Sequence, residues 1–265
     1  MSQVRASLWI GMSASDPPSG TPRGGTGLLP EDYLARALRA MDAEERRREA
    51  QLGLALPADA IELDTRVLLL RQVYLAEMAE RRYRRAAETA AAMAVVGPLA
   101  DIGHHDRCRA LQALGEVREA LGAQRLAARN APPRRRSFHY WALATLQHFA
   151  GDREGALRSL DKGLRHAQAD RPLLIAHEAY IRIEGGEAVE DLEGIRQELA
   201  TARCGQGYGQ LILGLIAHEI GDTPAARTHL RAFLRRNASA DEVKTATLRE
   251  ELRRARLALA EYEND

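Results

Sequence analysis

The densest group of side chains able to bind a metal lies between residues 104 and 108. It contains His104, His105, Asp106 and Cys108, and His139 follows further along the chain. Zinc needs three or four such ligands that converge on one point, whereas neighbouring helical residues such as His104 and His105 point in different directions. Cys108 also suits a buried position, where a free thiol behaves as a small apolar side chain. We therefore predict no metal site and no cofactor.

A basic run, Arg134, Arg135 and Arg136, stands just before the aromatic residues Phe138 and Trp141. Arginines can neutralise phosphates while aromatic rings stack on bases, so nucleic acid and an acidic protein surface are both candidate partners. A third interpretation is solvated charge in a loop between two helical units. The chain as a whole does not attract polyanions, because 38 basic and 37 acidic residues leave a net charge of +1. We place the run in a loop between two helical units. As a partner of this run, we rank an acidic protein surface above nucleic acid.

Sequence motifs of the common enzyme classes are absent. The chain has no glycine-rich phosphate loop after a strand, no His-Glu-x-x-His pair and no nucleophile elbow. Gly24, Gly25 and Gly27 fall in a stretch rich in Ser, Pro and Gly that is typical of a linker. We predict a non-catalytic protein with no catalytic residue.

Composition sets the fold class. Ala, Leu, Arg and Glu dominate the 265 residues, while β-branched and aromatic residues are few, which favours helices. The two cysteines are too few for a disulfide framework. No window approaches the roughly 18 uninterrupted apolar residues of a membrane span, and the short apolar run near the N-terminus differs from a signal peptide. We expect an all-α cytoplasmic protein without a membrane segment, in which residues 1–29 form a disordered leader.

The elements that position the candidate side chains recur with a period of about 34 residues. In the clearest copy, residues 140–167, the small residue Ala144 precedes Gly151 and Ala156 follows it at helical spacing. Glycine tolerates positive φ at a helix end, and small residues let paired helices approach closely. The turn position of this pattern falls at Arg81, Gly115, Gly151, Gly186 and Gly221.

A small residue, a turn glycine, an alanine, an apolar residue and a terminal proline in this order resemble the tetratricopeptide repeat. The resemblance covers five units, residues 67–100, 101–134, 137–170, 172–205 and 207–240. It implies a right-handed superhelical solenoid of antiparallel helix pairs. Asp191 stands where other units have alanine, so we expect an irregular second helix in the fourth unit.

Helical segments flank the repeats on both sides. Residues 30–66 form an N-terminal segment, in which one helix is expected from Pro30 to about Leu56, before Pro57. Asp64 or Thr65 is the expected N-cap of the first repeat. Residues 241–265 form a C-terminal helix that covers the last repeat from solvent.

In the resembled family, the first helix of each pair lines a concave groove that binds a partner. Carried over by offset from each small residue, this geometry implies a groove made of Arg71, His105, Arg109, Gln112, Trp141, Thr145, His148, Tyr180, Tyr208, Leu215 and His218. Aromatic residues here can anchor a bound segment, or they can pack between neighbouring units. The resemblance therefore implies a scaffold or adaptor that binds a peptide or helix of another protein. The other hypothesis is a regulatory or sensor module that binds a small peptide or nucleic acid.

Overall fold

The computed structural model describes residues 27–238 and 242–262, and these ranges contain helices and the turns that join them, with no strand. The first three helix pairs are α1 (Pro30–Arg39) with α2 (Ala43–Leu54), α3 (Leu63–Ala79) with α4 (Tyr83–Val96), and α5 (Ala100–Leu114) with α6 (Val117–Asn130). The next three are α7 (Pro133–Phe149) with α8 (Arg153–Leu164), α9 (Arg171–Glu184) with α10 (Leu192–Thr201), and α11 (Gly209–Glu219) with α12 (Thr223–Asn237). Two helices follow, α13 (Glu242–Thr247) and α14 (Arg249–Glu261), and short 3-10 helices occur at Ala58–Ala60 and Arg203–Gln206. The predicted all-α class is confirmed.

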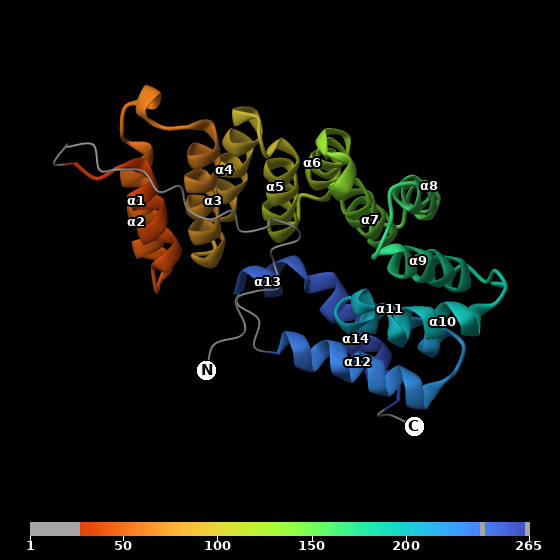
Figure 1. The fold of residues 1–265 in the computed structure, drawn as a ribbon. Coiled ribbons are helices and arrows are strands. Elements are labelled where there is room, and N and C mark those ends of the chain that lie inside the picture. Colours follow the sequence, from red (N-terminus) through yellow and green to blue (C-terminus); the bar gives the residue numbers. More distant parts are fainter. Residues whose placement is uncertain (1–26, 239–241, 263–265) are drawn as a thin grey trace.

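Neighbouring helices in the chain pack against one another as adjacent pairs. Figure 1 shows these pairs following one another along an arc from α1 to α12. The last two helices return to the inner side of this arc, where α13 lies against α3 and α5, and α14 lies against α11 and α12. The chain therefore brings its C-terminal residues next to helices near its start.

Five turns share one backbone geometry at the positions that the repeat pattern predicted. The φ angle is positive at Arg81, Gly115, Gly151, Gly186 and Gly221. After Gly115, the Glu116 amide donates to the Leu111 carbonyl (2.9 Å), which is the bond that closes a Schellman turn and satisfies the end of a helix. The predicted period of helix ends is confirmed, and one of the five turns uses an arginine where the others use glycine.

The contacts between paired helices, which we call helix seams, also follow the repeat pattern. Ala86, Ala120, Ala156 and Ala226, which follow the turns in four of the five units, are all fully buried. In the fourth unit Asp191 is exposed and takes a left-handed φ of 49°, so α10 begins only after it. The second helix of this unit therefore starts late, but from Leu192 to Thr201 it is a regular α-helix.

The N-terminal segment differs from the single helix that we expected. It forms a pair, α1 and α2, because the chain turns after Arg39 and Asp42 starts a new helix. The Asp42 carboxylate accepts a hydrogen bond from the Glu45 amide (2.8 Å), and this cap satisfies a donor that the first helical turn leaves free.

The start of α3 is also earlier than predicted. Glu62 is the N-cap residue, and its side chain makes no capping hydrogen bond. Thr65, one of the two expected caps, lies inside the helix and donates to Glu31 of α1 (3.0 Å). Its hydroxyl therefore joins two helix pairs instead of ending one.

The predicted leader, residues 1–29, lies outside the described residues except for its last three. None of the described helices has the length and apolar character needed to cross a membrane.

Candidate functional site

The C-terminal segment, which we define as residues 242–262 with α13 and α14, covers much of the surface formed by the first helices of the pairs. It contacts α3, α5 and α11, and Arg254 of α14 also reaches side chains of α7 and α9. This is the surface on which the resemblance places a partner-binding groove. The predicted C-terminal cap thus extends well beyond the last pair (Figure 1).

One face of α14 is apolar and buried. Leu252, Ala255 and Leu259 recur at helical spacing and share one core cluster with Tyr180 of α9 and Leu215 of α11. Tyr180 and Leu215 are two of the residues predicted to line the groove. Their apolar surface is covered by the chain's own helix.

Arg254 forms the principal polar contact of α14 with the surface beneath it. Its guanidinium donates to the Glu184 carboxylate (2.8 Å) and to the Tyr180 hydroxyl (3.2 Å). The same group lies over the Phe149 ring, 4.5 Å from its centroid, which adds a cation–π attraction. One side chain of α14 therefore binds both α7 and α9.

Two buried histidines, His148 and His177, lie next to the contact between Arg254 and Glu184. His148 Nε2 lies 2.6 Å from the carboxylate oxygen Glu184 Oε2, and His148 Nδ1 is 3.3 Å from His177 Nε2. The hydrogen bond from His148 lowers the pKa of Glu184 to about 2, so this carboxylate accepts and His148 donates. Burial lowers the pKa of His177 to about 3, which keeps it neutral.

A buried carboxyl group, that of Glu251, lies one helical turn before Arg254 and Ala255 on the same face of α14. Burial raises the pKa of Glu251 to about 7. The Tyr208 hydroxyl donates to Glu251 at 3.5 Å, and the Tyr208 ring packs edge-on against Trp141, with centroids 4.7 Å apart. These two predicted groove aromatics are thus joined to each other, and one of them to the C-terminal segment.

Two further predicted groove residues hold the ends of this segment. Arg109 donates to the Thr247 hydroxyl (2.7 Å) at the end of α13. His218 Nδ1 lies 2.7 Å from the Tyr262 hydroxyl just beyond α14. The segment is therefore held by polar contacts along its whole described length.

Arg71 and His105 form contacts with other helices of the repeats instead. Arg71 pairs with the buried Asp106 carboxylate (3.3 Å). His105 Nδ1 is 2.9 Å from Gln124 Oε1 of α6, and burial lowers the pKa of His105 to about 3. Both side chains join neighbouring helices.

Thr145 and Gln112 also bond within their own helices. The Thr145 hydroxyl donates to the Trp141 carbonyl (3.0 Å). The Cys108 thiol donates to Gln112 Oε1 (3.6 Å), and burial raises the pKa of Cys108 to about 12. Such a thiol is not a nucleophile near neutral pH.

The predicted loop position of the basic run is wrong. Arg134, Arg135 and Arg136 lie in the first turn of α7, which begins at Pro133. Arg135 forms two hydrogen bonds of 2.7 Å with Asp101, and Arg136 donates to a backbone carbonyl, that of residue 131. Within the run, only Arg134 is fully exposed.

Asp101 explains why α7 tolerates three arginines at its N-terminus, where the helix dipole disfavours cations. Burial alone would raise the pKa of Asp101, but hydrogen bonds from His139 and Arg135 outweigh it and hold the pKa well below its ordinary range. The ionised carboxylate on α5 therefore compensates the charge of the next pair. This contact between helices is not visible in the local sequence.

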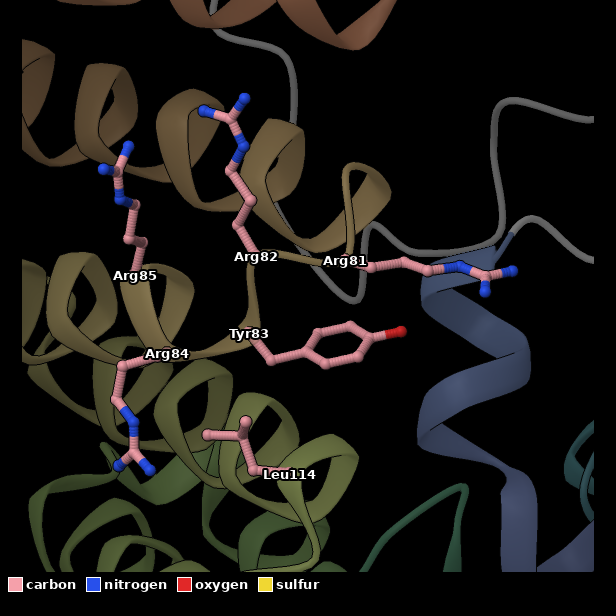
Figure 2. A pocket seen from close by; sticks show the side chains of 6 residues that line it. All are labelled: Arg81, Arg82, Tyr83, Arg84, Arg85 and Leu114. Carbon is pink, nitrogen blue, oxygen red and sulfur yellow. The ribbon is translucent and has the colours of Figure 1, made fainter.

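The sequence reasoning missed a second group of arginines, at the turn between α3 and α4. Figure 2 shows Arg81, Arg82, Arg84 and Arg85 around Tyr83, and these four arginines are exposed. The letters RRYRR were a readable signal. They were passed over because the turn was interpreted through the repeat pattern alone.

Within the described part of the chain, no group of three His, Cys, Asp or Glu side chains is placed to hold a metal ion. No known family model and no curated protein matches this chain. Fold and contacts together define an all-α protein of sequentially packed helix pairs, whose first-helix surface is covered by its own C-terminal segment.

Proposed function

We propose that this chain is a non-catalytic scaffold of tetratricopeptide-like repeats, forming a superhelical solenoid that binds a helix of another protein. The binding surface consists of the first helices of the pairs, from α5 to α11. In the state described above, α14 takes the place of the partner helix. Partner binding therefore requires the C-terminal segment to leave.

The contact of α14 with Tyr180, Glu184 and Leu215 is the observation that supports this function. An amphipathic helix already lies on this surface with an apolar face buried and an arginine paired. Grooves that accept one amphipathic helix bind others with the same pattern of anchors. The surface thus has the shape and chemistry of a helix-binding site.

The same contacts define the chemistry of the partner. Its helix carries small or aliphatic residues at the spacing of Leu252, Ala255 and Leu259. It also carries an arginine equivalent to Arg254, because Glu184 is ionised and needs a cation beside it. Binding of nucleic acid through the basic run has less support, because Arg135 and Arg136 form internal hydrogen bonds.

A labelled peptide of residues 242–262 tests the proposal by fluorescence anisotropy with the full chain. We expect the peptide to bind Arg254→Ala with a Kd about tenfold lower than wild type, because the weakened tethered helix leaves the surface free more often. Arg253→Ala is the matched control, since Arg253 is exposed and, among the residues that the structure describes, pairs with Glu250 of its own helix alone. It should bind the peptide as wild type does.

Equal peptide binding by the two variants would show that α14 does not compete for this surface. Co-purification followed by mass spectrometry then asks for the natural partner. A stoichiometric protein enriched with Arg254→Ala but not with Arg253→Ala supports the scaffold. Absence of any such enrichment argues against it.

A further inference from the structure

The end of α6 and the whole of α7 lie in a stretch of the chain without acidic residues. Between Glu119 and Asp152 there is no Asp or Glu, although the sequence of 265 residues contains 37 of them. The same stretch contains five arginines, which are Arg125, Arg129, Arg134, Arg135 and Arg136. Carboxylates that neutralise these arginines must therefore come from other helices or from a bound partner.

Only one of the five arginines pairs with a carboxylate, among the residues whose side chains the structure describes. Arg135 pairs with Asp101 of α5 (2.7 Å). Arg136 is partly buried and donates to the Ala131 carbonyl (3.1 Å), which is an uncharged acceptor. The other three are exposed and form no salt bridge with a described side chain: Arg125, Arg129 and Arg134. Most of the positive charge at the end of α6 is thus not compensated.

The helices packed against α6 have no carboxylate left for these arginines. Helix α6 packs against α5 and α7. Asp101 and Asp106 are the acidic residues of α5, and both are buried and already paired with arginines. Helix α7 contains no acidic residue, and Glu119 of α6 stands in the first turn, at the other end of its helix.

Helix α8, the second helix of the next pair, shows how exposed arginines are neutralised elsewhere in the chain. Arg158 pairs with Glu154 (3.1 Å), and Arg165 pairs with Asp161 (2.6 Å). In both cases the carboxylate stands one turn before the arginine, where oppositely charged side chains attract each other. The arginines of α8 therefore need no external partner.

The corresponding positions on α6 carry no carboxylate. Leu121 stands one turn before Arg125, and Arg125 itself stands one turn before Arg129. Like charges at this spacing repel each other, and a bound anion relieves the repulsion. Leu126, beside Arg125, is also exposed (38 %).

We define the basic α6 face as Arg125, Leu126, Arg129 and Arg134. Arg125 and Arg129 are about 6 Å apart along the helix axis, and only four residues separate Arg129 from Arg134 at the start of α7. Figure 1 shows α6 on the outer side of the arc, whereas α13 and α14 lie on its inner side. The basic α6 face is therefore separate from the surface that α14 covers.

We propose that the basic α6 face binds an acidic segment of another protein, whose Asp or Glu side chains pair with Arg125, Arg129 and Arg134. Guanidinium groups bind carboxylates through paired, charge-assisted hydrogen bonds. The exposed Leu126 adds an apolar contact of the kind that protein segments provide. This second site goes beyond the proposed function, because it does not require the C-terminal segment to leave.

Nucleic acid fits the basic α6 face less well. Proteins that bind single strands combine basic residues with aromatic side chains on which bases stack, and α6 contains no aromatic residue. The nearby aromatics of α7 have other contacts, since Phe138 packs against His105 and Trp141 packs against Tyr208. The face therefore offers charge without a stacking platform.

Fluorescence anisotropy with a labelled decaglutamate peptide and the full chain, at low ionic strength, tests this site. We expect the double variant Arg125→Gln, Arg129→Gln to bind the peptide at least about fivefold more weakly than wild type. The matched control is Arg158→Gln, Arg165→Gln, which removes two exposed arginines that already have carboxylate partners on α8. It should bind within about twofold of wild type.

Circular dichroism first establishes that both double variants are folded. Equal losses in the two variants, or no binding by wild type, would overturn the basic α6 face, because the positive charge would then be diffuse or too weak to bind. A labelled decauridylate RNA has a similar charge and serves as the second probe. If it binds more tightly than decaglutamate and loses more affinity in the α6 variant, the partner is nucleic acid and the acidic protein segment is wrong. None of these results depends on whether α14 leaves its surface, so the two proposals fail separately.

Discussion

The two halves of the molecule bury different side chains. Helices α4, α5 and α6 meet mainly through alanines, such as Ala87, Ala110 and Ala123. Helices α9, α11, α12 and α14 meet through Leu, Ile and Phe side chains, such as Ile212 and Phe233. Alanine seams bring the backbones of neighbouring helices close together. Large side chains stand further apart and can take in a helix from elsewhere in the chain.

The first half is held by packing between helices that are neighbours in the chain, whereas the second half also depends on packing between helices that are further apart in the chain. In the first half, each seam is complete once two neighbouring helices meet. In the second half, the core also needs α14, which supplies Leu252 and Leu259. This helix does not directly follow α12 in the chain, because α13 lies between them. We therefore expect the second half to lose stability when the C-terminal segment is weakened, while the first half keeps its own.

The largest expected effect is that of Leu252→Ala. This buried side chain lies in the cluster that holds α14, and its loss should cost about 3 kcal/mol of unfolding free energy, measured by urea melts. Hydrogen exchange should show lost protection in α9, α11 and α14 and little change in α4 to α6. Equal loss in both halves would mean that they unfold as one unit.

A glycine in each half tests how close the helices are. A Cβ on Gly103 would stand 2.6 Å from the backbone nitrogen of Ala94, whereas a Cβ on Gly214 would first meet the side chain of Leu230. Because backbone cannot move aside as a side chain can, Gly103→Ala should cost about 2 kcal/mol and Gly214→Ala about half of that.

Gly122 is the control for these two substitutions. A Cβ there meets nothing within 4 Å, so Gly122→Ala should raise stability by about 0.5–1 kcal/mol through helix propensity alone. The reverse order for Gly103 and Gly214 would contradict the view that alanine seams are the tighter ones.

Glu251 makes the docking of α14 depend on pH. Its pKa, raised by burial to about 7, means that the folded state keeps a proton that the unfolded state releases near its ordinary value. Stability from this group is therefore fully present below about pH 4.5 and falls as pH rises to about 7. Glu251→Gln should remove this fall and stabilise the protein at pH 8, by an amount on the order of 1–2 kcal/mol.

Thermal melts between pH 5 and 8 compare wild type with Glu251→Gln. Glu184 has the opposite sign, because its lowered pKa stabilises the fold at neutral pH and loses this effect only as pH falls toward 2. Parallel pH profiles for the two proteins would show that Glu251 is ionised in the folded state after all.

The smallest expected effect concerns the α3–α4 turn, which has Arg81 where the other four turns have glycine. Arg81 has a φ of 57°, a left-handed conformation that costs a residue with a Cβ about 1 kcal/mol. Arg81→Gly should therefore relieve this backbone cost and raise the midpoint of a urea melt slightly. Gly115→Ala, at a φ of 81°, is the reciprocal change and should lower stability by a similar amount.

Much of the fold follows from local spacing. The turn positions at Gly115, Gly151 and Gly221, and the buried alanines that follow them, were predicted because a sharp helix end and a close seam each require a particular residue type. Asp191 likewise indicated a departure from the pattern in the fourth unit, where α10 begins only after this residue. These features depend on residues a few positions apart, which a single sequence displays.

Helix starts were less visible. Arg134–Arg136 were placed in a loop because they fall between the second and third repeat units, whereas they begin α7, where three cations are unfavourable. Asp101, on the preceding pair, removes this cost through contacts that join residues far apart in sequence. The break after Arg39 was missed because an N-cap such as Asp42 is a weak local signal against a continuous amphipathic pattern.

The sequence by itself determined the all-α class, the repeat period, the turns and the alanine seams, because each rests on short-range sterics. Only the tertiary structure decided where the C-terminal segment goes. Its amphipathic pattern shows that α14 must cover some apolar surface. Many helices of this protein present an apolar surface, so the pattern alone does not say which of them α14 covers. The choice depends on Arg254 meeting Glu184 and on Leu252 joining the core cluster of α9, α11 and α12, and these contacts exist only once the pairs are assembled.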